Sequence, residues 1–315
     1  MKLHKIIFLL FLFAAQVFGQ KMEESQIYLA DPTIFEDNGT YYLYGTKNDA
    51  RIEGDGFLVY TSKDLKNWEG PAGINEGFAL KKGDAFGTKG FWAPQVFRYK
   101  KTYYMAYTAN ENIAIATSDS PLGPFTNNKE AIEAPVRQID PFIFFDDGIP
   151  YLYHVRLQEG NRIFVAEMTN DLKAIKPETL RECVHASADW EDTQNSDWKV
   201  TEGPTVLKKD KLYYLIYAAN DFRNPDYAVG YATSKSPMGP WAKAKENPLI
   251  SRENIGEFGS GHGDVVTNKN GDIYYVLHTH NSTFKVHPRK TAIVKIGFKG
   301  KKIMAYPDSF KWIKL

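Results

Sequence analysis

Short apolar runs alternate with polar turns along almost all of the chain that follows residue 25. The runs are rich in Val, Ile, Tyr and Phe, the residue types that favour strands, and long segments with a helical period are scarce. Aromatic residues make up 14% of the sequence, which adds to the same tendency. The pattern therefore predicts an all-β protein.

One pattern of two apolar runs occurs five times along the chain. Each copy has a short β-rich run, a polar turn, and a second run that opens with aromatic residues. Three of the turns contain Asn-Gly or Asp-Gly pairs, which supply the positive φ angles of tight hairpins. Every copy is therefore expected to begin with a hairpin. In chain order, the copies start at Asp31, Trp92, Asp140, Glu202 and His262.

A third apolar stretch follows most of the hairpins, and a Thr-Ser ending after it is expected to turn into a fourth strand. These third stretches span residues 57–60, 113–116, 163–166 and 227–232. Roughly 57 residues per copy suits a blade of four strands with long loops. The repeats predict a five-bladed β-propeller with four-stranded blades, because a β-sandwich, the alternative fold, would not explain five copies in one register.

Propellers need a closure between their first and last blades. We expect residues 25–29 to pair with a C-terminal strand, near either residues 303–306 or residues 310–313. No linker rich in Pro, Gly or Ser divides the chain, so residues 20–315 are expected to form one catalytic domain.

The first nineteen residues have the pattern of a signal peptide. Lys2 and Lys5 precede an apolar run over residues 6–15, and the small residue Gly19 suits a cleavage site. The run is short for a bilayer span, although a membrane anchor is the alternative interpretation. The protein is therefore expected to be secreted or periplasmic, without a membrane partner after cleavage.

Charge and cysteine content exclude several other classes of protein. The 39 basic and 38 acidic residues nearly cancel, which argues against nucleic acid as a partner. Cys183 is the single cysteine, so the protein must be held together by its core without disulfides. We expect it to be a monomer. A nucleophilic role for this thiol is a minor alternative, because no base can be assigned to it.

The starting residues of the five copies are the candidate functional residues. First strands of propeller blades lie nearest the axis, so their starts should face one another at one end of the channel. Three carboxylates gathered there would repel, which would raise the pKa of at least one and separate an acid from a base. The alternative for the two Asp-Pro pairs is a structural one, in which Asp caps a turn. The candidates are Asp31, Asp140 and Glu202, with His262 and Trp92 beside them.

Five short motifs at these starts resemble those of glycoside hydrolase family 43, whose members are five-bladed propellers that act on arabinose- and xylose-containing polysaccharides. The motifs are A-D-P-T, W-A-P, I-D-P, E-G-P and G-H-G-D, and the resemblance extends from residue 31 to about residue 298. It implies that Asp31 is the general base, Glu202 the general acid, and Asp140 a carboxylate that orients the acid and modulates its pKa.

The resemblance also assigns roles in binding. His262 matches a histidine at the axis that in many members touches a bound cation or its water shell, and calcium is the expected ion. A histidine that is only hydrogen-bonded to a carboxylate is the alternative. Arg289 matches an arginine that binds sugar hydroxyls. Trp92 would offer an apolar wall to a sugar face, or act as a wedge between blades.

The predicted activity is inverting hydrolysis of glycosidic bonds in arabinose- or xylose-containing plant oligosaccharides or polysaccharides. An exo-acting α-L-arabinofuranosidase or β-xylosidase is favoured. The alternatives are an endo-arabinanase or another glycosidase of the family and, from a different class, a noncatalytic propeller that binds glycans.

Overall fold

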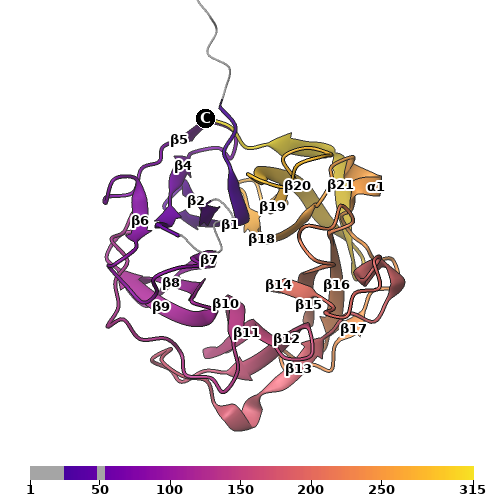
Figure 1. The fold of residues 1–315 in the computed structure, drawn as a ribbon, viewed down its shortest axis with the longest axis horizontal. Coiled ribbons are helices and arrows are strands. Elements are labelled where there is room, and N and C mark those ends of the chain that lie inside the picture. The colour runs from indigo at the N-terminus through magenta and orange to yellow at the C-terminus, as the bar shows by residue number, and fades with distance from the viewer. Residues whose placement is uncertain (1–24, 48–53) are drawn as a thin grey trace, which may run out of the picture.

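The computed structural model describes residues 25–47 and 54–315, in which five blade sheets are arranged around a central axis and a sixth sheet is a two-stranded ribbon (Figure 1). The predicted all-β five-bladed propeller is confirmed. The predicted signal peptide, residues 1–19, lies outside the described residues. Within the described ranges, no helix is long and apolar enough to cross a membrane.

Each blade begins with a hairpin whose first strand lies nearest the axis (Figure 1). Blade 1 contains β1 (Leu29–Asp37), β2 (Thr40–Lys47), β4 (Tyr60–Ser62) and β5 (Trp68–Glu69). Blade 2 contains β7 (Trp92–Tyr99), β8 (Thr102–Ala109) and β9 (Asn112–Ser118). Blade 3 contains β10 (Gln138–Asp146), β11 (Ile149–Leu157), β12 (Asn161–Glu167) and β13 (Arg181–Val184).

The last two blades have the same order of strands. Blade 4 contains β14 (Thr201–Lys209), β15 (Leu212–Ala219), β16 (Ala228–Ser234) and β17 (Ala242–Lys243). Blade 5 contains β18 (Gly261–Thr267), β19 (Ile273–Thr279), β20 (Lys290–Lys299) and β21 (Lys302–Trp312). The short helices η1 (Pro177–Thr179), η2 (Asp189–Glu191) and α1 (Arg252–Ile255) lie in connections between strands.

Two details differ from the predicted blades. The third strand of blade 1 is β4, whereas Phe57 belongs to β3 (Gly56–Leu58), which forms a separate two-stranded ribbon with β6 (Phe78–Lys81). In blade 2 the fourth position is a single bridge between Thr117 and Thr126. Apolar content alone could not separate these cases, because β3 in the ribbon buries Phe57 as a blade strand would.

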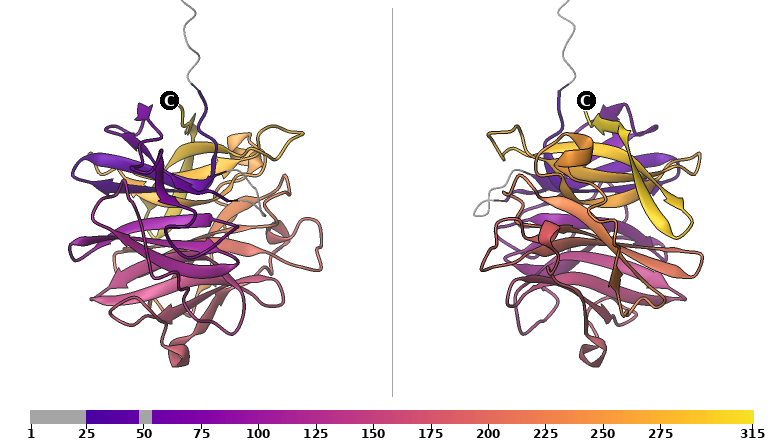
Figure 2. Two further views of the ribbon diagram at one scale, coloured as in Figure 1. Left: turned by 60° about the vertical axis from the view of Figure 1, so that its left-hand side comes forward. Right: turned by 90° about the vertical axis from the view of Figure 1, so that its right-hand side faces the viewer.

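The ring closes through the C-terminal end of the chain. Of the two predicted pairings, the structure has the one near residues 310–313. Ile27 donates its backbone N–H to the carbonyl of Ile313 over 3.1 Å, and Leu315 donates to Ser25 over 2.9 Å. The Gln26 side-chain amide also donates to carbonyl oxygens on both sides of this contact. Figure 2 shows the C-terminus beside the start of the described N-terminal segment.

Buried tyrosines on the second strands of the first four blades join neighbouring parts of the ring. Three of them, Tyr44, Tyr107 and Tyr153, donate their hydroxyl groups to backbone carbonyls of loops. Tyr217 differs, because its hydroxyl donates to the buried carboxylate of Glu191 over 2.6 Å. A buried tyrosine thus supplies apolar area and also satisfies a loop that would otherwise bury polar atoms.

Candidate active site

Each first strand contains a bulge at the end that faces the site. The pairing of the first two strands shifts register there in all five blades. One residue at each shift has a positive φ, a backbone conformation that costs a non-glycine residue about 1–2 kcal/mol. These residues are Asp31 (φ 47°), Ala93 (φ 45°), Asp140 (φ 54°), Gly203 (φ 59°) and His262 (φ 37°).

This backbone feature corrects the predicted equivalence of two site residues. Trp92 and Glu202 stand one position before the bulge residues of their blades. Glu202 pairs with Ala218 in the way that Ala30 pairs with Thr46, so its true counterpart in blade 1 is Ala30. The sequence analysis aligned the five copies by their functional side chains. The feature that the blades share is instead the positive φ of the bulge residue, which follows Trp92 and Glu202 in the sequence.

All six predicted site residues nevertheless line one cavity of about 1010 Å³ at the axis: Asp31, Trp92, Asp140, Glu202, His262 and Arg289. The three carboxyl groups come from blades 1, 3 and 4, and their side chains are buried. Trp92 also packs against a core cluster of blades 3 and 4, so both roles that we considered for it are compatible with its position.

One guanidinium group and two imidazole rings lie beside Asp31. Its Oδ1 lies 3.2 Å from Nη1 of Arg289 and 3.4 Å from Nδ1 of His278, and its Oδ2 accepts the Thr46 hydroxyl over 2.6 Å. Burial raises the pKa of this carboxyl, but Arg289, the histidines and the Thr46 hydrogen bond outweigh burial and hold the pKa well below its usual range. Asp31 is therefore ionised at neutral pH.

Neutral donors hold Glu202. Its Oε1 accepts the hydroxyl of Tyr227 over 2.8 Å, and its Oε2 accepts the side-chain amide of Asn161 over 2.9 Å. Burial, with a smaller contribution from the charges of Asp31 and Asp221, raises the pKa of Glu202 to about 7, although both hydrogen bonds act to lower it. Glu202 can therefore hold a proton at a pH where Asp31 cannot.

Asp140 lies between these two environments. Its Oδ2 accepts the backbone N–H of Gly203, the residue after Glu202, over 3.2 Å. Burial and then the charges of Glu202 and Asp31 raise its pKa well above the usual value. Asp140 and Glu202 consequently compete for protons, and the contact with Gly203 ties Asp140 to the strand that carries the glutamate.

The imidazole of His262 faces two of the carboxylates. Its Nδ1 lies 3.5 Å from Oδ1 of Asp31 and 3.7 Å from Oδ2 of Asp140. Burial lowers its pKa, so the ring is mainly neutral at pH 7. Behind it, a small cavity of about 20 Å³ is lined by oxygen-bearing residues that include Thr33, Thr205 and Asp264.

Four residues that the sequence did not single out support the predicted ones: Thr46, Asn161, Tyr227 and His278. His278 is fully buried, and its Nδ1 accepts the backbone N–H of Asp31 over 3.1 Å. Thr46 and Thr108 accept the corresponding N–H groups of Ala93 and Asp140. For Thr46 and His278 the signal was a repeated position on the second strand, visible only once the bulges are aligned; Asn161 and Tyr227 lie outside the second strands and share no such position.

Cys183 lies outside this cavity. It is in β13 of blade 3, and burial raises the pKa of its thiol well above the usual value. The position fits a structural residue.

Comparison with known proteins agrees with this geometry. The family model described as glycosyl hydrolases family 43 matches residues 25–302. A crystal structure titled endo-1,4-beta-xylanase from Bacteroides thetaiotaomicron VPI-5482 is 42% identical, with a TM-score of 0.84, over 93% of this chain and 98% of that one. The chain belongs to glycosyl hydrolases family 43. The family membership confirms the predicted resemblance and makes the protein an inverting glycoside hydrolase.

Two curated relatives of this family 43 enzyme are more distant. A protein named beta-D-galactofuranosidase xynD from Aspergillus niger is 25% identical over 297 residues, which cover 85% of this chain and 79% of that protein. A xylosidase/arabinosidase from Butyrivibrio fibrisolvens is 26% identical over 265 residues, and the match spans 78% of this chain but only 48% of that protein.

Proposed function

We propose that Asp31 is the general base of this enzyme, Glu202 the general acid, and Asp140 the carboxyl group that orients Glu202. The observation that carries the proposal is the contrast between two buried carboxyl groups in one cavity. Asp31 faces the guanidinium of Arg289, which lowers its pKa, whereas Glu202 is held by neutral donors, so burial raises its pKa. Such a difference supports a base role for Asp31 and an acid role for Glu202, the two groups that an inverting glycosidase needs.

The proposed reaction moves two protons in opposite directions. Ionised Asp31 takes a proton from a water molecule as that water attacks the anomeric carbon, and protonated Glu202 gives its proton to the departing glycosidic oxygen. Arg289 keeps Asp31 ionised and is placed to bind sugar hydroxyls from the same cavity. Trp92 offers its ring as an apolar wall to the sugar.

Leaving-group dependence tests the two main roles. Glu202→Ala should lose far more activity on an oligosaccharide than on a dinitrophenyl glycoside, because a dinitrophenolate departs without a proton. Asp31→Ala should fail on both substrates, since each needs an activated water. Losses of roughly 10²- to 10⁴-fold in kcat/KM are expected for acid/base assistance.

The same measurements can reject the assignment. Circular dichroism must first show that both variants are folded. If the dinitrophenyl glycoside rescued Asp31→Ala instead of Glu202→Ala, the roles of acid and base would have to be exchanged.

The proposed substrates are oligosaccharides or polysaccharides that contain arabinose or xylose, cleaved by an exo-acting α-L-arabinofuranosidase or β-xylosidase. The name of the Butyrivibrio relative supports this class. Endo-action is the second candidate, which the 42% identical relative titled endo-1,4-beta-xylanase and the cavity of about 1010 Å³ favour. Early products from linear arabinan and xylan decide between them, because exo-action releases monosaccharides and endo-action releases oligosaccharides first.

We also propose a hard cation such as calcium near His262. The described residues contain no group of three His, Cys, Asp or Glu side chains that could hold a metal, so water would complete the shell. The donor chemistry fits nevertheless, because a carboxylate and two hydroxyl groups line the small cavity behind the imidazole. A bound cation would supply positive charge next to the carboxylates.

Chelation tests the cation. His262→Ala should lower activity, and exhaustive chelation should lower the activity of the wild type by a comparable factor and restore it when calcium is returned. An enzyme that keeps full activity after chelation, with no calcium found by elemental analysis, would contradict the proposed ion.

The proposed export and monomeric state rest on the sequence. Mass spectrometry of protein expressed from the full reading frame should find an N-terminus at Gln20, and size-exclusion chromatography should find one chain per particle.

A further inference from the structure

Trp198 lines the same cavity as the carboxyl groups, yet nothing in the proposed reaction uses it. Trp198 is 50% exposed, so its ring is accessible to a ligand in this cavity. It lies in the connection between β13 and β14, a stretch without a counterpart in the repeated pattern of the blades.

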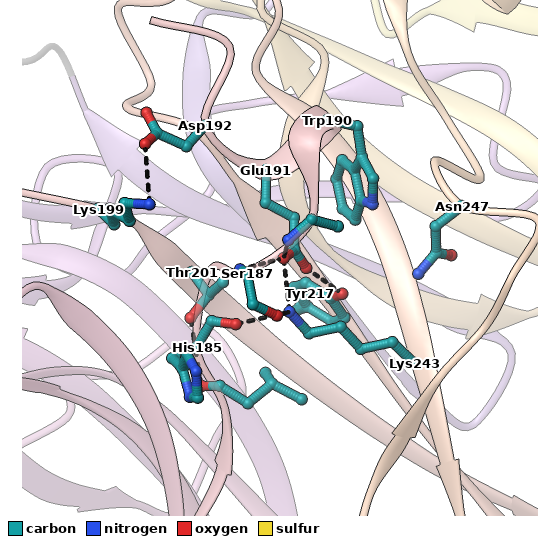
Figure 3. A network of polar contacts seen from close by, with 12 residues as sticks. His185, Ser187, Trp190, Glu191, Asp192, Lys199, Thr201, Tyr217, Lys243 and Asn247 are labelled. Atoms are coloured by element: carbon teal, nitrogen blue, oxygen red, sulfur yellow. Dashed lines mark hydrogen bonds and ion pairs between the residues drawn. The ribbon is translucent and has the colours of Figure 1, made fainter. Parts of the chain in front are cut away.

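A buried carboxylate fixes the loop that carries this tryptophan. Glu191, at the end of η2, is fully buried and accepts the backbone N–H groups of Ser187 and Ala188 over 2.7 and 2.8 Å. It also accepts the hydroxyl of Tyr217 and forms an ion pair with Lys243, both from blade 4 (Figure 3). The loop is therefore tied to a blade wall through charge-assisted hydrogen bonds.

A second ion pair closes the loop next to Trp198. Lys199 and Asp192 form this pair (Figure 3), with Nζ 3.5 Å from Oδ2. The other oxygen of Asp192 accepts the backbone N–H of Ser196. The ion pair thus joins the two ends of the segment 192–199, which contains Trp198. An exposed aromatic ring on such an anchored loop loses little conformational entropy when a ligand binds.

The indole is connected to the proposed general acid. Its Nε1–H donates to Oδ1 of Asn161 over 2.9 Å, and Nδ2 of Asn161 donates to Oε2 of Glu202 over 2.9 Å. A chain of two hydrogen bonds therefore joins an exposed aromatic ring to the carboxyl group that would protonate the departing oxygen.

We propose that Trp198 forms the binding site for the leaving-group sugar, with its ring as a stacking platform for a pentose face. The inference rests on the proposed role of Glu202: the oxygen that the acid protonates belongs to the leaving group, so a platform beside the acid contacts that part of the substrate. Asn161, held by both neighbours, aligns the acid with the sugar on the platform.

A comparison of two substrates tests this subsite. One is an arabino- or xylo-oligosaccharide that the enzyme cleaves, and the other is the glycosyl fluoride of the same sugar, whose leaving group is one atom. Trp198→Ala should lower kcat/KM on the oligosaccharide by roughly tenfold, mainly through KM, a loss of about 1.4 kcal/mol that is within the range of one aromatic contact. Activity on the fluoride should change by less than about twofold on the same reasoning.

Two further variants make the test specific. Tyr306→Ala removes an aromatic ring of similar exposure, 47%, on β21 of blade 5, and should leave both substrates unaffected. Trp198→Phe keeps a ring but loses the donor to Asn161. It should retain most of the oligosaccharide affinity, while the alkaline limb of its pH profile moves upward because Asn161 holds the Glu202 carboxylate less well.

The outcomes separate this inference from the proposed function. An equal loss on both substrates would overturn the subsite, since the ring would then serve the reacting sugar or the fold, and no loss on either would overturn it as well. A wrong assignment of Glu202 would instead appear as an exchange of the Asp31→Ala and Glu202→Ala patterns on activated substrates, whatever Trp198→Ala does.

Discussion

At the scale of single residues, the neighbours of each carboxyl group decide what it can do. Asp31 and Glu202 are both buried and line one cavity, so burial alone would raise the pKa of both. Arg289 beside Asp31 reverses the effect of burial there. The side chains that hold Glu202, Asn161 and Tyr227, are neutral and only moderate it. The groups around Asp31, with the Arg289 guanidinium the largest contribution, thus separate the base from the acid.

The pH dependence of kcat/KM should reflect the raised pKa of Glu202. Glu202 must be protonated to act, so kcat/KM should fall as the pH rises through about 7, the pKa of this group. Tyr227→Phe removes a hydrogen bond that stabilises the ionised form. The pKa of Glu202 should then be higher, and the alkaline limb should move to higher pH. The measurement is kcat/KM against pH for both proteins.

Tyr107→Phe is the matched control for this variant. It removes a tyrosine hydroxyl that donates to the carbonyl of Phe86 in blade 2, away from Glu202. Its alkaline limb should coincide with that of the wild type. A limb that moved downward in Tyr227→Phe, or moved equally in both variants, would show that the hydroxyl of Tyr227 does not set the pKa of the acid.

At the scale of elements, the sequence predicted the hairpins well and the bulges poorly. Hairpins have local signals, namely Asn-Gly or Asp-Gly turns between apolar runs. The bulge depends on the backbone conformation of one residue, and side chains as different as those of Asp31, Ala93 and Gly203 occupy it. A proline follows this residue in four blades, which was the signal that could have placed Glu202 one position earlier.

The supporting residues of the site were not predictable from the repeat. Asn161 contacts Glu202 across 41 residues of sequence and Trp198 contacts Asn161 across 37, and these contacts follow no local period. Glu191 has no motif around it, because its partners lie up to 52 residues away in sequence. Only the fold brings such side chains together, whereas Asp31, Asp140 and Glu202 could be found because the blade starts converge.

Two single substitutions at the bulges of blades 2 and 4, Ala93→Gly and Gly203→Ala, should have opposite effects on stability. Ala93→Gly removes the cost of a positive φ in a residue with a Cβ, about 1–2 kcal/mol, and adds back part of it as backbone entropy. A net gain of up to ~1 kcal/mol, or about 2 °C in Tm, is expected. Gly203→Ala should lower both stability and activity, since its Cβ would lie 2.6 Å from the His262 ring.

Calorimetry and urea unfolding measure both variants. The comparison fails if Ala93→Gly is as destabilising as Gly203→Ala. In that case the methyl group of Ala93, which is buried, would contribute more through packing than its backbone conformation costs.

At the scale of the whole molecule, the contact between blades 1 and 5 has two functions. It closes the ring through hydrogen bonds between the N-terminal segment and residues 313–315. It also completes the site, because Asp31 comes from blade 1 while His278 and Arg289 come from blade 5. The two blades are far apart in sequence, so their alignment depends on closure, and an opening of the ring should affect the base before it affects most strands.

Ile313→Ala tests this link between closure and chemistry. Ile313 is 2% exposed and packs in the cluster shared by blades 1 and 5, so its truncation should cost about 2–4 kcal/mol. During urea titration, activity should be lost at a lower concentration than the circular dichroism signal, because local opening at the closure separates Asp31 from Arg289 while the other blades stay folded. Ile132→Ala, at 5% exposure in the cluster of blades 2 and 3, should lose stability without separating the two transitions. If activity and circular dichroism change together in both variants, the ring unfolds as one unit and closure has no separate effect on the base.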